Sequence, residues 1–140
     1  MKALTLTQPW ASLVARGTKQ VETRSWHTSY TGLLAIHAAK GYPRFAKEFT
    51  LKLRAKQLLP VETLPLSAIV ALVRLEECLD TGGVVVSELE RSLGDYTSGQ
   101  FAWFFNPSSI VALPEPVPCR GALGLWTVPD EIAARLGGPS

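Results

Sequence analysis

Hydrophobic and polar residues alternate at the start of the chain, and this two-residue period predicts a β-strand over Lys2–Thr7. The signals then change to those of a helix. Pro9 suits the first helical turn and Gly17 suits the position just after the last one, so we expect a helix over Pro9–Arg16. A second helix is expected to begin at Pro43. Its apolar stripe consists of Phe45, Phe49 and Leu53. Its opposite, basic side consists of Arg44, Lys47 and Arg54.

The rest of the chain divides into short apolar segments separated by turn-forming residues. The segments predict strands over Lys19–Trp26, Leu33–Ala38, Ala68–Leu75, Phe101–Phe105, Ile110–Leu113 and Gly121–Val128. A short helix is expected over Val85–Leu93, and a capping box, Thr127-x-x-Asp130, predicts a last helix that Gly137 closes. Short strands with helices between them indicate an α+β fold with a small mixed β-barrel.

Composition narrows the class of protein. A chain of 140 residues with 46% hydrophobic and 19% charged residues fits one globular domain, here residues 1–140. Its apolar run Ala68–Val73 is far shorter than a membrane span, and no secretory signal is recognised at the N-terminus. Cys78 and Cys119 have no neighbouring ligands at metal spacing, so we expect reduced thiols in a cytoplasmic protein that binds no metal and no cofactor.

Charge is distributed unevenly along the chain. Residues 1–56 hold ten basic and two acidic residues, a net charge of +8, whereas the remainder carries −6. A basic half of this kind is typical of a surface that binds a polyanion, although a solvated face without a partner would look the same.

One motif stands out in the basic half: Gly17-x-Lys19-x-x-Glu22-x-Arg24, directly after the first expected helix. Together with Tyr30-Thr31-Gly32, Ile36–Lys40, Gly99–Trp103 and Gly121-x-x-Gly124-Leu125-Trp126, the chain resembles ASCH domains over residues 3–128. This resemblance implies a PUA-like fold, similar to the PUA domains of RNA-modifying proteins. The turn departs from the family pattern, which often carries Tyr-Arg-Gly where this chain has Thr31.

The motif can also be interpreted from its side chains. Glu22 and Arg24 would share one face of a strand, where an acid and a guanidinium can hydrogen-bond the edge of a base. Lys19 would meet a phosphate, or act as a base if buried. The alternative is an exposed Glu22–Arg24 ion pair beside a solvated lysine. We expect the ligand site to include Gln8, Trp10, Lys19, Glu22, Arg24, Ser25, Trp26 and Lys40.

Aromatic residues extend this hypothesis. Trp10 and Trp26 flank the motif and are candidates for stacking on bases, whereas Trp103 is expected in the core and Trp126 is undecided. His37 lies in an apolar strand and is expected to be a hydrogen-bonded core histidine.

Two classes of function remain open, and a third, a regulatory or protein-interaction domain, has no groove-binding stripe or tail in the sequence to support it. The first is a binding module for RNA or a modified nucleoside, without chemistry. The second is an enzyme, because the resemblance extends to small ASCH proteins that hydrolyse N4-acetylcytidine with the motif lysine, a threonine and a glutamate. Lys19 matches that lysine, but Glu22 occupies the place of the threonine, so Lys19 and Glu22 would have to be the catalytic pair. A ribonuclease using the same cleft is a further alternative. We favour binding.

Overall fold

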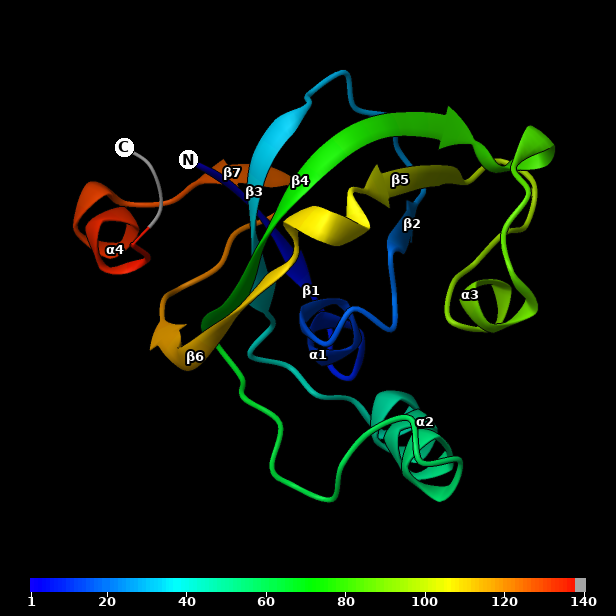
Figure 1. Ribbon diagram of the computed structural model, residues 1–140, viewed down its shortest axis with the longest axis horizontal. Coiled ribbons are helices and arrows are strands. Elements are labelled where there is room, and N and C mark those ends of the chain that lie inside the picture. Colours follow the sequence, from blue (N-terminus) through cyan, green and yellow to red (C-terminus); the bar gives the residue numbers. More distant parts are fainter. Residues whose placement is uncertain (138–140) are drawn as a thin grey trace.

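A strongly curved sheet of seven strands forms the centre of the computed structural model, which describes residues 1–137 (Figure 1). The strands are β1 (Lys2–Leu6), β2 (Val21–Arg24), β3 (Gly32–Ala38), β4 (Ala68–Asp80), β5 (Phe101–Phe105), β6 (Val111–Pro118) and β7 (Leu125–Thr127). Their order is β2-β5-β4-β3-β1-β7, with β6 also paired to β4. β1 and β3 run parallel, and the other pairs are antiparallel.

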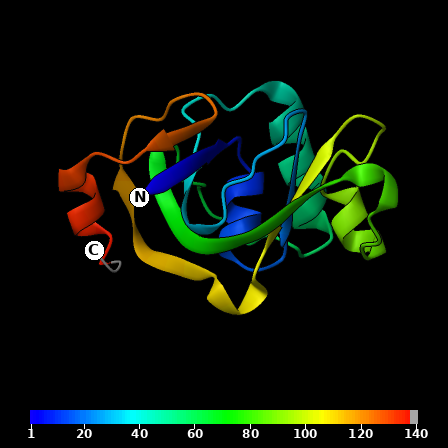
Figure 2. The same ribbon diagram turned by 90° about the horizontal axis from the view of Figure 1, so that it is seen from above.

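The length and curvature of β4 bend the sheet toward a barrel. β4 has 13 residues and arches across the molecule (Figures 1 and 2). It pairs with β3 on one edge, so its partners β6, at residues 68–72, and β5, at residues 75–80, share the other edge. This strand therefore organises most of the sheet by itself.

A hydrogen bond from a side chain of β2 to the backbone of β1 links two strands that are not neighbours in the sheet. The Leu6 carbonyl accepts from the Ala39 backbone N–H near β3, so the preceding carbonyl of Thr5 points to the opposite edge of β1. On that edge β7 pairs with β1 only as far as Leu4, so it does not reach Thr5. The Arg24 Nη2 atom of β2 donates to the Thr5 carbonyl at 2.6 Å. The barrel is thus partly closed by a guanidinium.

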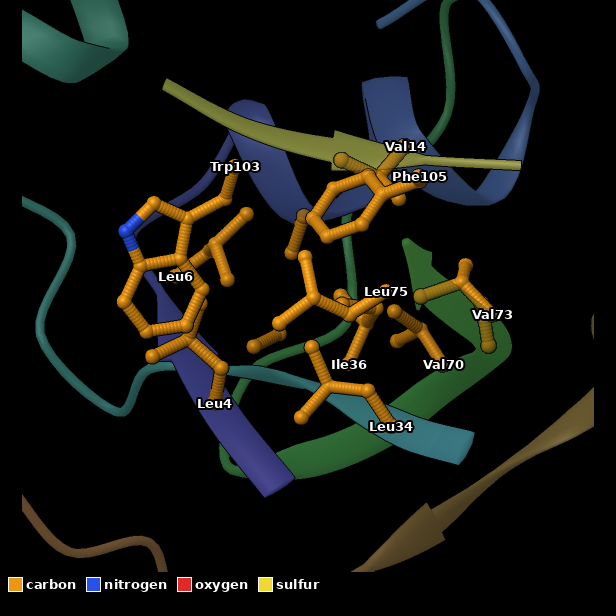
Figure 3. Packing of buried hydrophobic residues seen from close by; sticks show 13 residues of the cluster. Leu4, Leu6, Val14, Leu34, Ile36, Val70, Val73, Leu75, Trp103 and Phe105 are labelled. Carbon is orange, nitrogen blue, oxygen red and sulfur yellow. The ribbon is translucent and has the colours of Figure 1, made fainter. Parts of the chain in front are cut away.

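The main hydrophobic core lies inside this curve. Figure 3 shows Leu4, Leu34, Leu75 and Trp103 converging from β1, β3, β4 and β5, and each of these side chains is at least 99% buried. Each such side chain contributes about 1.5–3 kcal/mol to folding by leaving water. A smaller cluster on the outer face of the sheet includes Ile69 and Trp126 and contacts α4 (Asp130–Arg135) through Ile132.

Three other α-helices precede α4. Helix α1 (Trp10–Ala15) packs on the sheet, whereas α2 (Arg44–Ala55) and α3 (Glu88–Ser92) lie farther from it (Figure 1). The 3₁₀ turns Thr81–Gly83 and Pro107–Ser109 follow β4 and β5. Leu13 of α1, Leu53 of α2 and Leu93, which follows α3, form a third apolar cluster with Leu59. None of the helices within residues 1–137 has both the length and the hydropathy that crossing a membrane requires.

The α+β class and most element positions are confirmed, with four differences in the strands. The strand expected over Ala68–Leu75 continues as β4 to Asp80. The segment expected as a strand over Gly121–Val128 is a strand only at β7, and Gly124 before it has φ +67°, a left-handed conformation that interrupts a strand. The strand expected over Ile110–Leu113 continues as β6 to Pro118, because an edge strand tolerates prolines whose missing N–H groups would face away from the sheet. The strand expected over Lys19–Trp26 is confined to β2.

The capping box predicted at Thr127 and Asp130 is wrong. Thr127 is the last residue of β7 and pairs with Lys2 of β1, and its hydroxyl accepts from Lys2 Nζ at 3.2 Å. Pro129 occupies the N-cap of α4, which has no side-chain capping bond. The threonine is therefore held by the sheet, two residues too early to cap the helix.

Replacing Leu4 with alanine should lower the free energy of unfolding by about 2–5 kcal/mol, because it opens a cavity in a fully buried position. Urea denaturation monitored by tryptophan fluorescence measures this loss. Val85→Ala is the matched control, since Val85 is 94% exposed and should change stability by less than about 0.5 kcal/mol. Equal effects of the two substitutions would contradict the placement of the core.

Candidate functional site

A cleft of about 570 Å³ opens between α1, α2, β2 and the segment that follows α3. Its volume lies within the range of small-molecule sites. It is lined by Thr5, Thr7, Trp10, Glu22, Thr23, Arg24, Ser25, Phe45, Phe49, Ser92, Leu93, Gly94, Asp95 and Gln100. Of the residues expected in the ligand site, the cleft brings together Trp10, Glu22, Arg24 and Ser25.

One wall of the cleft is aromatic. The ring of Trp10 stacks on Phe49 of α2, with centroids 5.3 Å apart and planes inclined by 16°. Phe45, one helical turn before Phe49, lies 6.2 Å from Trp10 and remains 64% exposed. The indole of Trp10 is oriented by its Nε1 atom, which donates to the Leu93 carbonyl at 3.0 Å. The wall is thus fixed at Trp10 and open at Phe45.

A polar part of the lining is formed by the ion pair between Glu22 and Arg24. Arg24 Nε donates to Glu22 Oε2 at 3.0 Å, as expected for residues two apart on one strand. Arg24 also donates to the Thr5 carbonyl, so this guanidinium both closes the barrel and borders the cleft. Its side chain is 25% exposed, compared with 12% for Glu22. The pair is therefore only partly available to a ligand.

Lys19 lies behind the lining rather than in it. Its side chain is fully buried, and Nζ donates to the Leu93 carbonyl at 3.1 Å. Two carboxylates approach the ammonium: Glu22 Oε1 at 3.8 Å and Glu90 Oε2 at 4.0 Å. The Leu93 carbonyl consequently accepts from both Lys19 and Trp10. Lys19 supports the cleft through these contacts instead of pointing into it.

Glu90 belongs to the same buried polar cluster and the partly buried Tyr96 lies near it, and the sequence analysis missed both. Glu90 Oε1 accepts from the Gln20 backbone N–H at 2.8 Å, and burial raises the pKa of the Glu90 carboxyl. Burial and the nearby charge of Glu90 raise the pKa of Tyr96 to about 12. A signal for Glu90 was present: Ser87-x-x-Glu90 is a capping-box pattern, and the Ser87 hydroxyl does accept from the Glu90 N–H at 3.1 Å.

The other expected site residues lie outside the cleft. Gln8 is fully buried, and its amide bonds Ser12 and the Pro65 carbonyl. Trp26 packs edge-on against Trp103, with centroids 4.7 Å apart. Lys40 lines a different cavity. The core placements expected for Trp103 and His37 are confirmed, since both are at least 99% buried and both are hydrogen-bonded.

Both cysteines are free thiols. Across residues 1–137, His, Cys, Asp and Glu side chains form no group of three or more that could hold a metal ion.

Replacing Lys19 with methionine should destabilise the fold by about 3–5 kcal/mol at pH 7, because Glu90 loses its buried counter-charge, whereas Glu22 keeps Arg24. The Glu90 carboxyl, whose pKa burial already raises, would then lose the ammonium that counters this effect, so its folded-state pKa would lie above its unfolded one. The variant therefore binds more protons when folded and loses stability as the pH rises, so its deficit should shrink toward pH 5.

Urea denaturation of both proteins at pH 7 and pH 5 measures this difference. Lys52→Met, at an exposed position of α2, is the control and should change stability by less than about 0.5 kcal/mol. A deficit below about 1 kcal/mol, or one that is identical at the two pH values, would contradict the role given to Lys19.

The sequence of this chain is similar to those of known proteins. The chain is 37% identical to activating signal cointegrator 1 of Mus musculus and 38% identical to that of Homo sapiens. Each alignment covers 92% of this chain but 22% of the relative, so the chain spans about a fifth of the length of these relatives.

Solved structures show the same fold. The ASCH protein of Zymomonas mobilis superposes with a TM-score of 0.56 over 96% of this chain and 92% of its own, at 13% identity. A point variant of that protein gives 0.57 over 96% and 94%, at 14% identity. The expected PUA-like class of fold is thereby confirmed. The ASCH domain model matches residues 4–108, which is most of the chain, and this protein belongs to the ASCH family.

Proposed function

We propose that this ASCH domain binds single-stranded RNA, or a nucleoside derived from it, by inserting a base into the cleft beside Trp10. The observation that carries the proposal is the aromatic wall. An exposed phenylalanine in a hollow, next to a tryptophan whose orientation is fixed, offers a flat apolar surface of the kind on which bases stack. The similarity of ASCH domains to the PUA domains of RNA-modifying proteins supports the same ligand class.

Polar groups around the wall suit the edge of a base. Glu22 supplies a carboxylate acceptor, Arg24 supplies N–H donors, and Ser25, Asp95 and Gln100 add both kinds of group. Because Glu22 and Arg24 already bind each other at 3.0 Å, their contribution to affinity comes from the lone pairs and protons that this bond leaves free. Stacking therefore provides most of the binding energy, and the polar groups provide orientation.

The basic helix α2 supplies the electrostatic part. Phe45 and Phe49 of this helix line the cleft, and the same helix exposes Arg44, Lys47 and Lys52. Arg44 is paired with Glu48 at 3.3 Å, but both side chains are largely exposed, so this pair is screened by water. A phosphate backbone that follows the cleft past α2 would meet a positive surface.

Phe45→Ala should weaken binding of a short single-stranded RNA by about 1–3 kcal/mol, the loss expected for one stacked base. The variant should fold normally, because Phe45 is 64% exposed. Leu51→Ala is the matched control: Leu51 is on the same helix, is 65% exposed and does not line the cleft. Fluorescence anisotropy with a labelled hexanucleotide measures both.

The same titration at several salt concentrations tests the charge argument. The logarithm of the association constant should fall by about 0.7 per neutralised phosphate for each unit increase in the logarithm of salt concentration. If Leu51→Ala weakens binding as much as Phe45→Ala does, the aromatic wall is not the binding surface.

One observation favours a second candidate, hydrolysis of an N4-acylated cytidine: Lys19 and Glu90 lie behind the cleft and adjoin Glu22, which lines it. Against it, Lys19 is fully buried, and the Thr23 hydroxyl accepts from the Asp95 N–H at 2.8 Å. We expect the wild-type protein to bind N4-acetylcytidine without turnover, as followed by chromatography of the products.

Turnover that is lost in Glu22→Gln by about 10²–10⁴ and kept in Thr23→Ala would reverse this ranking and make Glu22 the general base.

A further inference from the structure

A second cavity, of about 910 Å³, lies on the outer side of β1 and β3, against the loop between β6 and β7. Its floor is formed by Thr5 and His37. Lys40 and Arg120 stand at its border, together with two exposed leucines, Leu66 and Leu123. The Gly17-x-Lys19-x-x-Glu22-x-Arg24 motif contributes no residue to this cavity.

The charge of the second cavity has one sign. Lys40 and Arg120 are the charged residues in its lining, and no acidic residue lines it. Both side chains are exposed, and within residues 1–137 neither has an ion pair or a side-chain hydrogen bond. By contrast, Lys19, Arg24 and Arg44 all have carboxylate neighbours. An anion at this cavity would therefore meet two positive charges without displacing a carboxylate.

A buried network fixes the loop that carries Arg120. His37 Nε2 lies 2.6 Å from the Cys119 carbonyl, so Nε2 carries the proton, and Nδ1 accepts from the Thr5 hydroxyl at 3.1 Å. The Thr5 oxygen in turn accepts from Trp126 Nε1 at 3.0 Å. Burial lowers the pKa of His37, which keeps this neutral tautomer at pH 7.

Gly121 completes the fit between loop and sheet. A Cβ atom at this position would lie 2.6 Å from His37 Cε1 and 2.8 Å from Thr5 Oγ1, so only glycine lets the loop pack this closely. The backbone on both sides of Arg120 is therefore held by the sheet before any ligand arrives. Such preorganisation lowers the entropic cost of binding.

Thr5 joins the second cavity to the cleft. It lines both, with its carbonyl bound by Arg24 of the cleft and its hydroxyl bound by His37 of the second cavity. The two hollows thus meet at the free edge of β1. A strand with a base against Trp10 would have to pass this shared residue to enter the second cavity.

We propose that the second cavity is a subsite for the neighbouring phosphodiester of a single-stranded RNA whose base occupies the cleft, with Lys40 and Arg120 binding the phosphate. Leu66 and Leu123 would then pack against the adjoining ribose or base. The proposal rests on the function proposed above, because it is the base in the cleft that brings the strand to this site.

Arg120→Gln and Lys40→Gln test the subsite, with Arg74→Gln as the control that removes an equal charge from an exposed position outside both cavities. Each protein is titrated with cytidine, which has no phosphate, and with a labelled RNA hexanucleotide. We expect both subsite variants to bind cytidine like the wild type but to bind the hexanucleotide about fivefold more weakly, or weaker still, at low salt. Their salt slope should become shallower by about 0.7 for each phosphate that the variant no longer neutralises.

The outcomes separate this proposal from the cleft itself. If Arg120→Gln and Lys40→Gln bind the hexanucleotide as Arg74→Gln does, while Phe45→Ala binds it weakly, the subsite is wrong and the cleft stands. If the subsite variants fail to bind cytidine as well, the second cavity is not a separate subsite. If the wild type binds neither ligand, the proposed function and the subsite both fail.

Discussion

The buried ammonium of Lys19 is the interaction on which the site depends. It bonds the carbonyl of Leu93 and faces the carboxylates of Glu22 and Glu90, so it joins the turn after α1 to β2 and to α3. A buried lysine needs such partners, because an isolated charge in the interior is strongly destabilising. The same Leu93 carbonyl orients the Trp10 indole. The position of the aromatic wall is therefore set by a charge that no ligand can touch.

This arrangement separates the residues that build the cleft from those that face a ligand. Lys19 and Glu90 are enclosed, and Arg24 uses one donor to close the barrel at Thr5. Phe45, by contrast, is a large side chain of the cleft that remains exposed to solvent. A motif of charged residues thus acts mainly as a scaffold, and weaker ligand binding after mutation of Lys19 would not by itself show that Lys19 touches the ligand. Exposed aromatic and basic side chains are the more informative positions to mutate.

Much of the fold followed from the sequence because it rests on local patterns. The two-residue period at Leu4 and Leu6 and the Pro-to-Gly span of the first helix needed no long-range information. The cleft was only partly predictable. Glu90 lies 71 residues after Lys19 in the sequence, and only the tertiary fold, which brings α3 to the segment before β2, makes them neighbours. Trp26 was assigned to the site because it flanks the motif, and Lys40 because it ends another stretch of the family pattern, but Trp26 packs against Trp103 and Lys40 lines the second cavity.

The four tryptophans offer the most direct test of the claim that a base enters the cleft. Their indole N–H groups give separate signals in a two-dimensional ¹H–¹⁵N spectrum, with Trp10 at the cleft and Trp103 fully buried in the core. On titration with a short single-stranded RNA, the Trp10 signal should shift progressively while the Trp103 signal stays in place. An unmoved Trp10 signal at RNA concentrations that saturate binding would contradict the account.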